Sequence, residues 1–134
     1  GDDVVHGDSA DFLAGGGRND AILGGTGDDT INGGAGSDTL SGGDGADVFV
    51  WTTFGSGTSE IDHLIDFEDG IDSFRMEGVS GIPGTGLQGR LDALNLTEVF
   101  VDGEVAVAMS YNSTTIVVQG ADLSILSVED FAFL

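Results

Sequence analysis

Aspartate recurs in the first fifty residues with a spacing that suits a metal ion. Six Asp residues lie nine positions apart, and a large apolar residue follows each of them two positions later. The six are Asp2, Asp11, Asp20, Asp29, Asp38 and Asp47, and their apolar partners are Val4, Leu13, Ile22, Ile31, Leu40 and Phe49. Carboxylate oxygens are the ligands that hard divalent cations such as calcium prefer, so a regular row of them predicts a series of metal sites.

The rest of each nine-residue unit predicts how these carboxylates are held. The units start at His6, Gly15, Gly24, Gly33 and Gly42, and four of the five open with Gly-Gly. Six residues rich in Gly and Asp favour a tight turn, and the other three form a short strand whose middle residue faces the core. If two units close one coil, each residue lies beneath the residue 18 positions later, at about 4.8 Å. Asp11, Asp29 and Asp47 then stack on one edge, and Asp2, Asp20 and Asp38 stack on the other.

Such columns need a cation. Two carboxylates about 5 Å apart repel each other by roughly 3 kcal/mol at an effective dielectric constant near 20. Arg18 is the only base nearby, and the opposing core has one apolar residue per unit. Calcium accepts carboxylate and backbone carbonyl oxygens in flexible geometry, whereas magnesium demands a strict octahedron. Asp residues that only cap turns would explain one unit, but not six in register. We therefore expect a calcium-dependent fold.

The pattern G-G-x-G-x-D-x-U-x, where U is a large apolar residue, is complete in the units from Gly24, Gly33 and Gly42. It is looser at Gly15, where Arg18 stands at the fourth position, and loosest at His6. The pattern resembles the calcium-binding nonapeptide repeats of the RTX (hemolysin-type) family. The resemblance implies a right-handed parallel β-roll, with each ion between one turn and the turn after next. About three to five Ca²⁺ ions are expected.

The resemblance also implies the ligands. One turn supplies the carbonyls of positions 2 and 4 with its Asp, and the other supplies those of positions 1 and 3 with its Asp. The first implied site is Gly25, Gly27 and Asp29 with Gly42, Asp44 and Asp47. The second is Gly16, Arg18 and Asp20 with Gly33, Ala35 and Asp38. The third is Gly7, Ser9 and Asp11 with Gly24, Thr26 and Asp29. A fourth pairs Asp2 with Gly15, Gly17 and Asp20. The turn glycines Gly34, Gly36, Gly43 and Gly45 are counted with these sites.

The segment Gly45–Phe74 resembles the transition that follows RTX repeats in secreted metalloproteases and alginate epimerase modules. It carries the run Asp62, Leu64, Asp66, Phe67, Gly70 and Asp72, with Arg75 where the family usually has another Asp. Asp62 is expected to complete a further site on Gly43, Gly45 and Asp47. The alternative is that Asp62, Asp66, Glu68, Asp69 and Asp72 form a solvated acidic loop.

The second half predicts an ordinary β core. Nine of the ten aromatic residues lie from Phe49 onward, so this part is expected to cap the open end of the roll. Residues 79–90 are rich in Gly and predict a loop, and strand-like runs follow at 94–102, 104–111 and 114–119. The last two runs predict a hairpin, and Ser127 with Asp130 predicts one capped helical turn. The fold class is therefore all-β, with a parallel β-roll (1–50) and a mostly antiparallel cap (51–134) in one continuous unit.

Composition excludes several functions. The chain has 24 Asp and Glu against 3 Arg and no Lys, a net charge of −21, which excludes nucleic-acid binding and a Walker-type phosphate loop. It has no Cys, and no apolar run approaches the roughly 20 residues of a membrane span. Its 40% hydrophobic residues disfavour disorder. No G-x-S-x-G or H-E-x-x-H signature is present, so we do not expect an enzyme, although the parent protein can be one.

The resemblance implies a module that folds on binding extracellular calcium and supports the secretion and stability of a larger bacterial protein. The ending Asp130, Phe131, Phe133 and Leu134 resembles the C-terminal signal read by type I secretion machinery. The alternative is an accessory polysaccharide-binding module, as in alginate epimerases. The lack of a basic groove disfavours a polyanion such as alginate. A catalytic domain upstream in the chain is a further expected partner.

Overall fold

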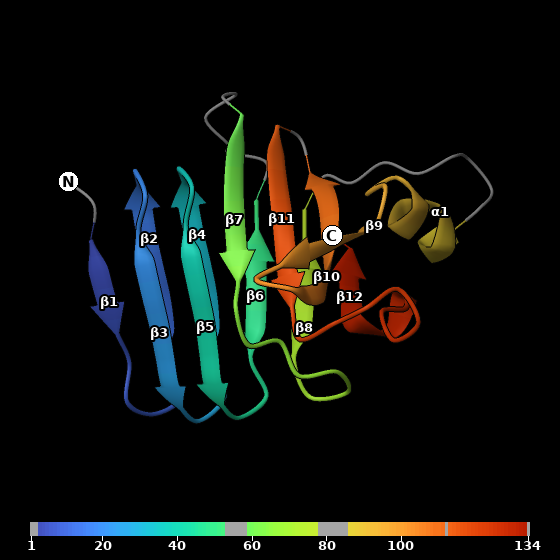
Figure 1. Ribbon diagram of the computed structural model, residues 1–134. Helices are drawn as coiled ribbons and strands as arrows, with labels where there is room; N and C mark the ends of the chain where they lie inside the picture. The colour runs from blue at the N-terminus through green and yellow to red at the C-terminus, as the bar shows by residue number, and fades with distance from the viewer. Residues whose placement is uncertain (1–2, 53–58, 78–85, 112, 134) are drawn as a thin grey trace.

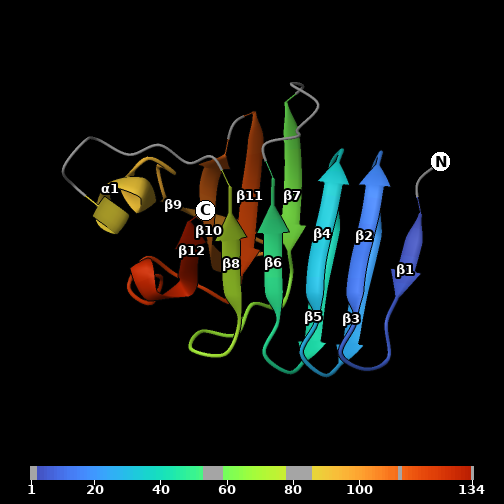
Figure 2. The same cartoon turned by 180° about the vertical axis from the view of Figure 1, so that it is seen from behind.

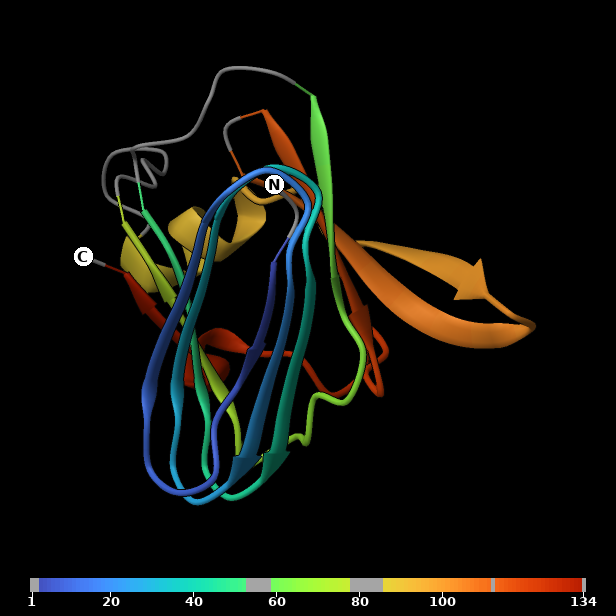
Figure 3. The same ribbon diagram turned by 90° about the vertical axis from the view of Figure 1, so that its left-hand side faces the viewer.

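The first half of the chain winds into a flattened parallel coil. The computed structural model describes residues 3–52, 59–77, 86–111 and 113–133. Successive strands alternate between two facing sheets, so that the chain crosses from one sheet to the other at every turn (Figures 1 and 3). The six strands are β1 (Val4–His6), β2 (Phe12–Gly17), β3 (Ala21–Thr26), β4 (Thr30–Ala35), β5 (Thr39–Asp44) and β6 (Val48–Trp51).

Strand pairing has the predicted 18-residue offset. Ile22 pairs with Leu40 between β3 and β5, and Ile31 pairs with Phe49 between β4 and β6. The apolar residue of each of the five complete units points between the sheets and is buried. Fully burying such a side chain contributes about 1.5–3 kcal/mol. The parallel β-roll expected from the sequence is therefore confirmed.

The first coil differs from the expected register by one residue. Val4 pairs with Ala21 and Val5 pairs with Ile22, an offset of 17 residues. Val5 therefore packs against the core, while Val4 is 67% exposed. The prediction that Val4 faces the core is wrong, because one missing residue reverses which side chains face inward. Asp2 lies outside the described residues.

The second half extends both sheets. Strand β7 (Glu60–Leu64) pairs in parallel with β5, and β8 (Ser73–Met76) pairs in parallel with β6. Three more strands, β9 (Thr97–Val101), β10 (Glu104–Tyr111) and β11 (Thr114–Gln119), join the first sheet. Its order is β1-β3-β5-β7-β11-β10-β9, and the β10–β11 pairing is antiparallel, as the predicted hairpin requires. The antiparallel β9–β10 pair projects away from the roll (Figure 3).

A helix replaces part of the expected loop. The Gly-rich composition of residues 79–90 predicted a loop, but α1 spans Gly86–Asp92. Leu91 and Leu94 are buried in the common core, so packing outweighs the low intrinsic helix propensity of glycine. Residues 78–85 lie outside the described part of the chain. No helix in the described ranges has the length and apolar character to cross a membrane.

The C-terminus closes the second sheet, whose order is β12-β8-β6-β4-β2 (Figure 2). The predicted helical turn is a 3₁₀ turn (Val128–Asp130), capped reciprocally by Ser127 and Asp130. It leads into β12 (Phe131–Phe133), which pairs in parallel with β8. Phe74 stacks between Phe67 and Phe131, with ring centroids 4.8 Å away on each side. This aromatic stack packs the last strand against β8 within the cap.

Candidate metal centre

The repeat aspartates form two hydrogen-bonded columns. The backbone N–H of Asp11 donates to Asp29 Oδ1 (2.7 Å), and that of Asp29 donates to Asp47 Oδ1 (2.9 Å). On the other edge, the N–H of Asp20 donates to Asp38 Oδ1 (2.8 Å). The predicted stacking of these five residues is confirmed. One oxygen of each acceptor carboxylate is thereby held in place by the preceding coil.

The second column begins at Asp3. The backbone N–H of Asp3 donates to Asp20 Oδ1 (2.8 Å), which is the bond that each repeat Asp makes to the next coil. The sequence placed Asp2 there. Asp3 takes this position because the first unit is one residue short.

Both columns continue beyond the repeats. The N–H of Asp38 donates to Asp62 Oδ1 (2.9 Å), and the N–H of Asp47 donates to Asp72 Oδ1 (3.0 Å). Asp62 therefore follows Asp38 and not Asp47, which corrects its expected place. Asp72 is buried rather than part of a solvated loop. A signal for both was present, because a buried apolar residue follows each of them two positions later, as in the repeats.

Four carboxylate oxygens in these columns have no partner. They are Oδ2 of Asp20, Asp29, Asp38 and Asp47, and all four residues are almost fully buried. A buried carboxylate oxygen without a hydrogen bond or counter-charge costs several kcal/mol. The same kind of atom is orphaned in four successive repeats, so the cause is the repeat itself. Each of these four repeat units therefore calls for a positive charge beside its Oδ2 atom.

Backbone carbonyls lie near two of these orphaned oxygens, those of Asp20 and Asp29. A Cβ atom added to Gly24 would collide with both Asp29 Oδ2 and the carbonyl oxygen of Gly42. A Cβ added to Gly15 would lie 2.6 Å from both Asp20 Oδ2 and the carbonyl oxygen of Gly33. Each carboxylate therefore shares its surroundings with a carbonyl of the next coil. These are two of the oxygen pairs implied for the first and second sites, although the full ligand sets remain predictions.

The third implied site differs from the first two. Gly7 lies close to Asp11 Oδ2 and the carbonyl oxygen of Gly24, as in the other turns. Here, however, Asp11 Oδ2 accepts a hydrogen bond from the N–H of Asp8 (2.9 Å). Asp11 is also more exposed than the Asp residues of the later coils. The first coil therefore needs a cation less than the coils that follow.

Burial sets the electrostatics of the columns. It raises the pKa of Asp38 and of Asp47 to about 6, against the lowering effect of the backbone hydrogen bonds from Asp20 and Asp29. Neighbouring carboxylates, first Asp62 and Asp72 respectively, raise these two pKa values further. Burial is also the main cause that raises the pKa of Asp62 and of Asp72. The metal-free folded state therefore disfavours the charged carboxylates.

The donor chemistry fits calcium. In the described ranges no three His, Asp or Glu side chains gather closely enough to hold a metal by side chains alone. A bound ion must therefore take backbone carbonyl oxygens as well, and the glycine-rich turns present them. A mixed set of carboxylates and carbonyls, without nitrogen or sulfur, is the set that calcium accepts. When bound, the ion would supply the positive charge that the buried Oδ2 atoms lack.

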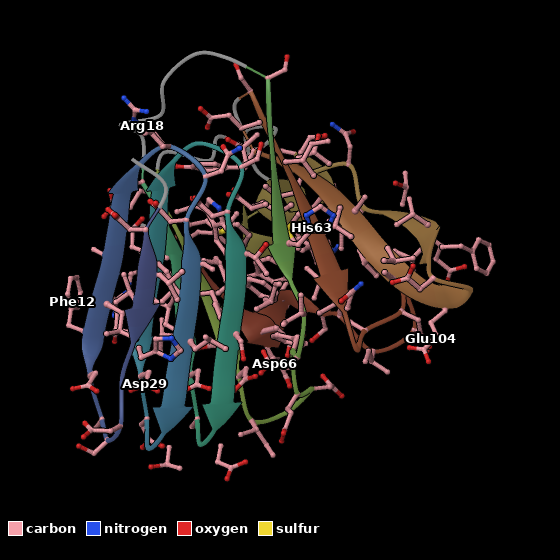
Figure 4. The ribbon with its side chains drawn as sticks, turned by 60° about the vertical axis from the view of Figure 1, so that its left-hand side comes forward. Phe12, Arg18, Asp29, His63, Asp66 and Glu104 are labelled. Atoms are coloured by element: carbon pink, nitrogen blue, oxygen red, sulfur yellow. The ribbon has the colours of Figure 1, made fainter. Side chains whose placement is uncertain are left out.

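Arg18 stands where the repeats have glycine. Its φ angle is 91°, and the equivalent Gly27, Gly36 and Gly45 have φ angles of 99°, 122° and 133°. A side chain in this left-handed region costs roughly 1–3 kcal/mol. The backbone of Arg18 is therefore strained. Its side chain lies at the exposed edge of the roll (Figure 4).

Comparisons with known proteins agree with this geometry. Residues 14–49 match the family model of the RTX calcium-binding nonapeptide repeat, in four copies. The fold is similar to the AlgE6R3 subunit of the Azotobacter vinelandii mannuronan C5-epimerase. The match has a TM-score of 0.68 and 26% identity, and it covers 98% of this chain and 77% of that one. The AlgE6R2 subunit of the same organism's epimerase gives a TM-score of 0.60 and 24% identity, over 99% and 92% of the two chains.

A third similar structure is the extracellular lipase LipA from Serratia marcescens. It has a TM-score of 0.55 and 20% identity, over 96% of this chain but 20% of the lipase. No curated protein sequence matches the chain. The solved structures match this chain with epimerase subunits and with a small part of a lipase. The family match agrees with the prediction of a calcium-binding repeat module, and the solved structures agree with the predicted β-roll fold.

Proposed function

We propose that this calcium-binding β-roll, built on RTX nonapeptide repeats, folds when calcium binds and serves as a module of a larger exported protein. The observation that supports the proposal is the set of four buried Oδ2 atoms without a hydrogen-bond partner, two in each aspartate column. They penalise the folded state as long as no cation is bound. A ligand that binds only the folded state stabilises it by mass action, so calcium drives folding.

The residues proposed to hold the ions are those with orphaned oxygens. Asp20 would bind with the carbonyl of Gly33, and Asp29 with the carbonyl of Gly42. Asp29 is shared between the first and third implied sites, so occupation of one site favours the other. Shared ligands make binding cooperative. Calcium sites in extracellular EF-hand modules have dissociation constants of about 10⁻⁴–10⁻³ M, and we expect the same range here.

The C-terminal segment supports a proposal that export precedes folding. Asp130 is buried and bonds Ser127, while Phe131 stacks on Phe74. These residues also form the segment that resembles a type I export signal. In the folded module they are engaged in the cap, so secretion machinery would read them before the cap folds. We propose that low calcium keeps the repeats unfolded for export and that extracellular calcium then folds them.

Far-UV circular dichroism during a calcium titration tests the proposal. The protein is first freed of metal with a chelator, and magnesium is titrated as the control. We expect a cooperative gain of β signal with calcium and little change with magnesium at the same concentration. A spectrum that is fully folded without calcium and does not respond to it would refute calcium-driven folding. Equilibrium dialysis with calcium would then show whether the ions bind at all.

A second candidate function is polysaccharide binding. It is favoured by the similarity to subunits of a mannuronan C5-epimerase. The net charge of −21 opposes binding of a polyanion such as mannuronan. Affinity electrophoresis in gels containing mannuronan or a neutral glucan, with calcium present, separates the cases. Retardation by mannuronan alone would support this candidate, and equal mobility in all gels would reject it.

A further inference from the structure

The last aspartate of each column differs from the four interior ones. The interior residues Asp20, Asp29, Asp38 and Asp47 leave Oδ2 without a partner. At Asp62, Oδ2 accepts a hydrogen bond from the Trp51 indole Nε1–H (2.8 Å). At Asp72, Oδ2 accepts one from the backbone N–H of Glu68 (2.9 Å). A protein N–H group therefore stands at each column end where the interior has nothing.

Trp51 is well placed for this contact. It ends β6, is almost fully buried, and its ring lies 6.1 Å from that of Phe74. Asp62 is 1% exposed, and its other oxygen accepts the N–H of Asp38 (2.9 Å). Both carboxylate oxygens of Asp62 thus have protein donors. A carboxylate supplied with two donors gains charge-assisted hydrogen bonds and has less need of a cation.

We propose that the Trp51 indole N–H takes the place of a calcium ion at Asp62 and ends the column of metal sites at Asp38. Trp51 is then a positioning residue that holds the terminal carboxylate, and Asp62 is not a calcium ligand. The N–H of Glu68 does the same at Asp72. This inference rests on the proposed calcium-dependent folding. It explains how a repeating metal-bound structure can join a metal-free cap without leaving a buried charge unpaired.

The count of bound ions tests the proposal directly. Asp62→Asn keeps the Oδ1 that accepts from Asp38 but removes the negative charge. Bound calcium is counted by equilibrium dialysis or native mass spectrometry, and Asp38→Asn is the matched variant one coil earlier. We expect Asp62→Asn to bind as many ions as the wild type and Asp38→Asn to bind at least one fewer. Loss of an ion from Asp62→Asn would make Asp62 a ligand and overturn the inference.

Trp51→Phe tests the role of the indole donor. The variant keeps an aromatic ring near Phe74 and removes the N–H, which leaves Asp62 Oδ2 orphaned. We expect the calcium concentration at the folding midpoint to rise about threefold, because the loss of a hydrogen bond to a charged group is spread over about three ions. In an Asp62→Asn background the same substitution should shift the midpoint much less. Equal shifts in both backgrounds would reduce Trp51 to a packing residue.

These outcomes separate the inference from the function on which it rests. Wild-type protein that binds no calcium would overturn the proposed function and this inference together. Wild-type protein that folds with calcium, combined with an ion lost on Asp62→Asn, would overturn the inference alone. Circular dichroism is the folding readout throughout, because Trp51 is the only tryptophan and fluorescence would be lost with it.

Discussion

The repeat roll and the C-terminal cap treat buried carboxylates in opposite ways. In the roll, four successive aspartates have a buried oxygen without a partner. In the cap, Asp62 is bonded by Trp51 and Asp38, Asp72 by Glu68 and Asp47, and Asp130 by Ser127. Asp66 accepts from Ser41 Oγ (2.6 Å) and from the N–H groups of Gly42 and Gly43 (3.0 Å each). The need for a cation is therefore a property of the roll.

The cap also has a larger apolar core than the roll. The roll buries one apolar side chain per nine residues between its sheets. The cap adds the Phe67–Phe74–Phe131 stack and a layer of buried aliphatic residues from β10 and β11. Burial of apolar area stabilises a domain without help from ligands, whereas stacked charges destabilise it. The comparison indicates that the cap is a stable base and the roll is the part that responds to calcium.

Removal of calcium should separate the two regions most clearly. We expect chelation to unfold the roll while strands β10 and β11 stay protected, because the orphaned carboxylates found among the described residues all lie in the roll. Hydrogen exchange with mass spectrometry would show fast exchange over residues 3–50 and slow exchange over 104–119. If both segments lose protection together, the roll and the cap form a single cooperative unit and the comparison fails.

Substitution of a shared aspartate should have the next largest effect. In Asp29→Asn the Oδ1 acceptor is kept, but the charged Oδ2 is lost from two implied sites. We expect the calcium midpoint of folding to rise about tenfold, which corresponds to roughly 1.4 kcal/mol per ion-binding step. Asp8→Asn is the control, because Asp8 is exposed. Equal midpoints for the two variants would argue against Asp29 as a ligand.

Acidification should stabilise the metal-free roll. The pKa of Asp38 and of Asp47 is raised from 3.8 to about 6 in the folded state, so folding takes up protons between these values. Stability then falls as the pH rises through this window, since the folded state binds more protons than the unfolded state. The far-UV β signal of dialysed, calcium-free protein should be larger at pH 5 than at pH 7, because protonation favours the folded roll. The opposite order would mean that these carboxylates are not buried without calcium.

Loss of the Ser127 hydroxyl, which caps the 3₁₀ turn, should destabilise the C-terminal cap and leave the roll unchanged. Ser127→Ala removes the hydroxyl that accepts from Glu129 and is expected to cost about 1 kcal/mol. The melting temperature with saturating calcium should fall, while the calcium midpoint of the roll stays close to that of the wild type. Ser124→Ala, in an exposed turn, is the control for loss of a hydroxyl. A large shift in the midpoint would show that the roll depends on this end of the cap.

Arg18→Gly should have the smallest effect and the opposite sign. Glycine relieves the strain at a φ angle of 91°, and the substitution removes a positive charge near the second implied site. We expect the calcium midpoint to fall by about twofold, because relief of left-handed strain contributes roughly 1–3 kcal/mol spread over several ions. Arg75→Gly, on β8, controls for the change in net charge. A rise in the midpoint would instead identify Arg18 as a counter-ion for Asp20 or Asp38.

Much of this molecule follows from local sequence pattern. The nine-residue period predicted the parallel coil, its 18-residue offset and the two Asp columns from Asp11 to Asp47. The strand-like runs at 104–111 and 114–119 predicted the β10–β11 hairpin, and Ser127 with Asp130 predicted the capped turn. These features were predictable because the repeat and the turn chemistry are short-range. Each nine-residue unit specifies its own turn and strand. Carboxylate columns without bases also made a cation the expected partner.

Long-range packing decided the rest. The register of Val5, the helix that buries Leu91, and the places of Asp62 and Asp72 depend on segments that lie far apart in the sequence. Asp62 pairs with Asp38 at an offset of 24 residues, and Asp72 pairs with Asp47 at an offset of 25. The nine-residue period does not predict these offsets, because they include loops of irregular length. The sequence alone determined that stacked carboxylates require a cation. Only the tertiary structure decided which of them lack a protein donor, because the N–H groups of Trp51 and Glu68 reach Asp62 and Asp72 only in the folded chain.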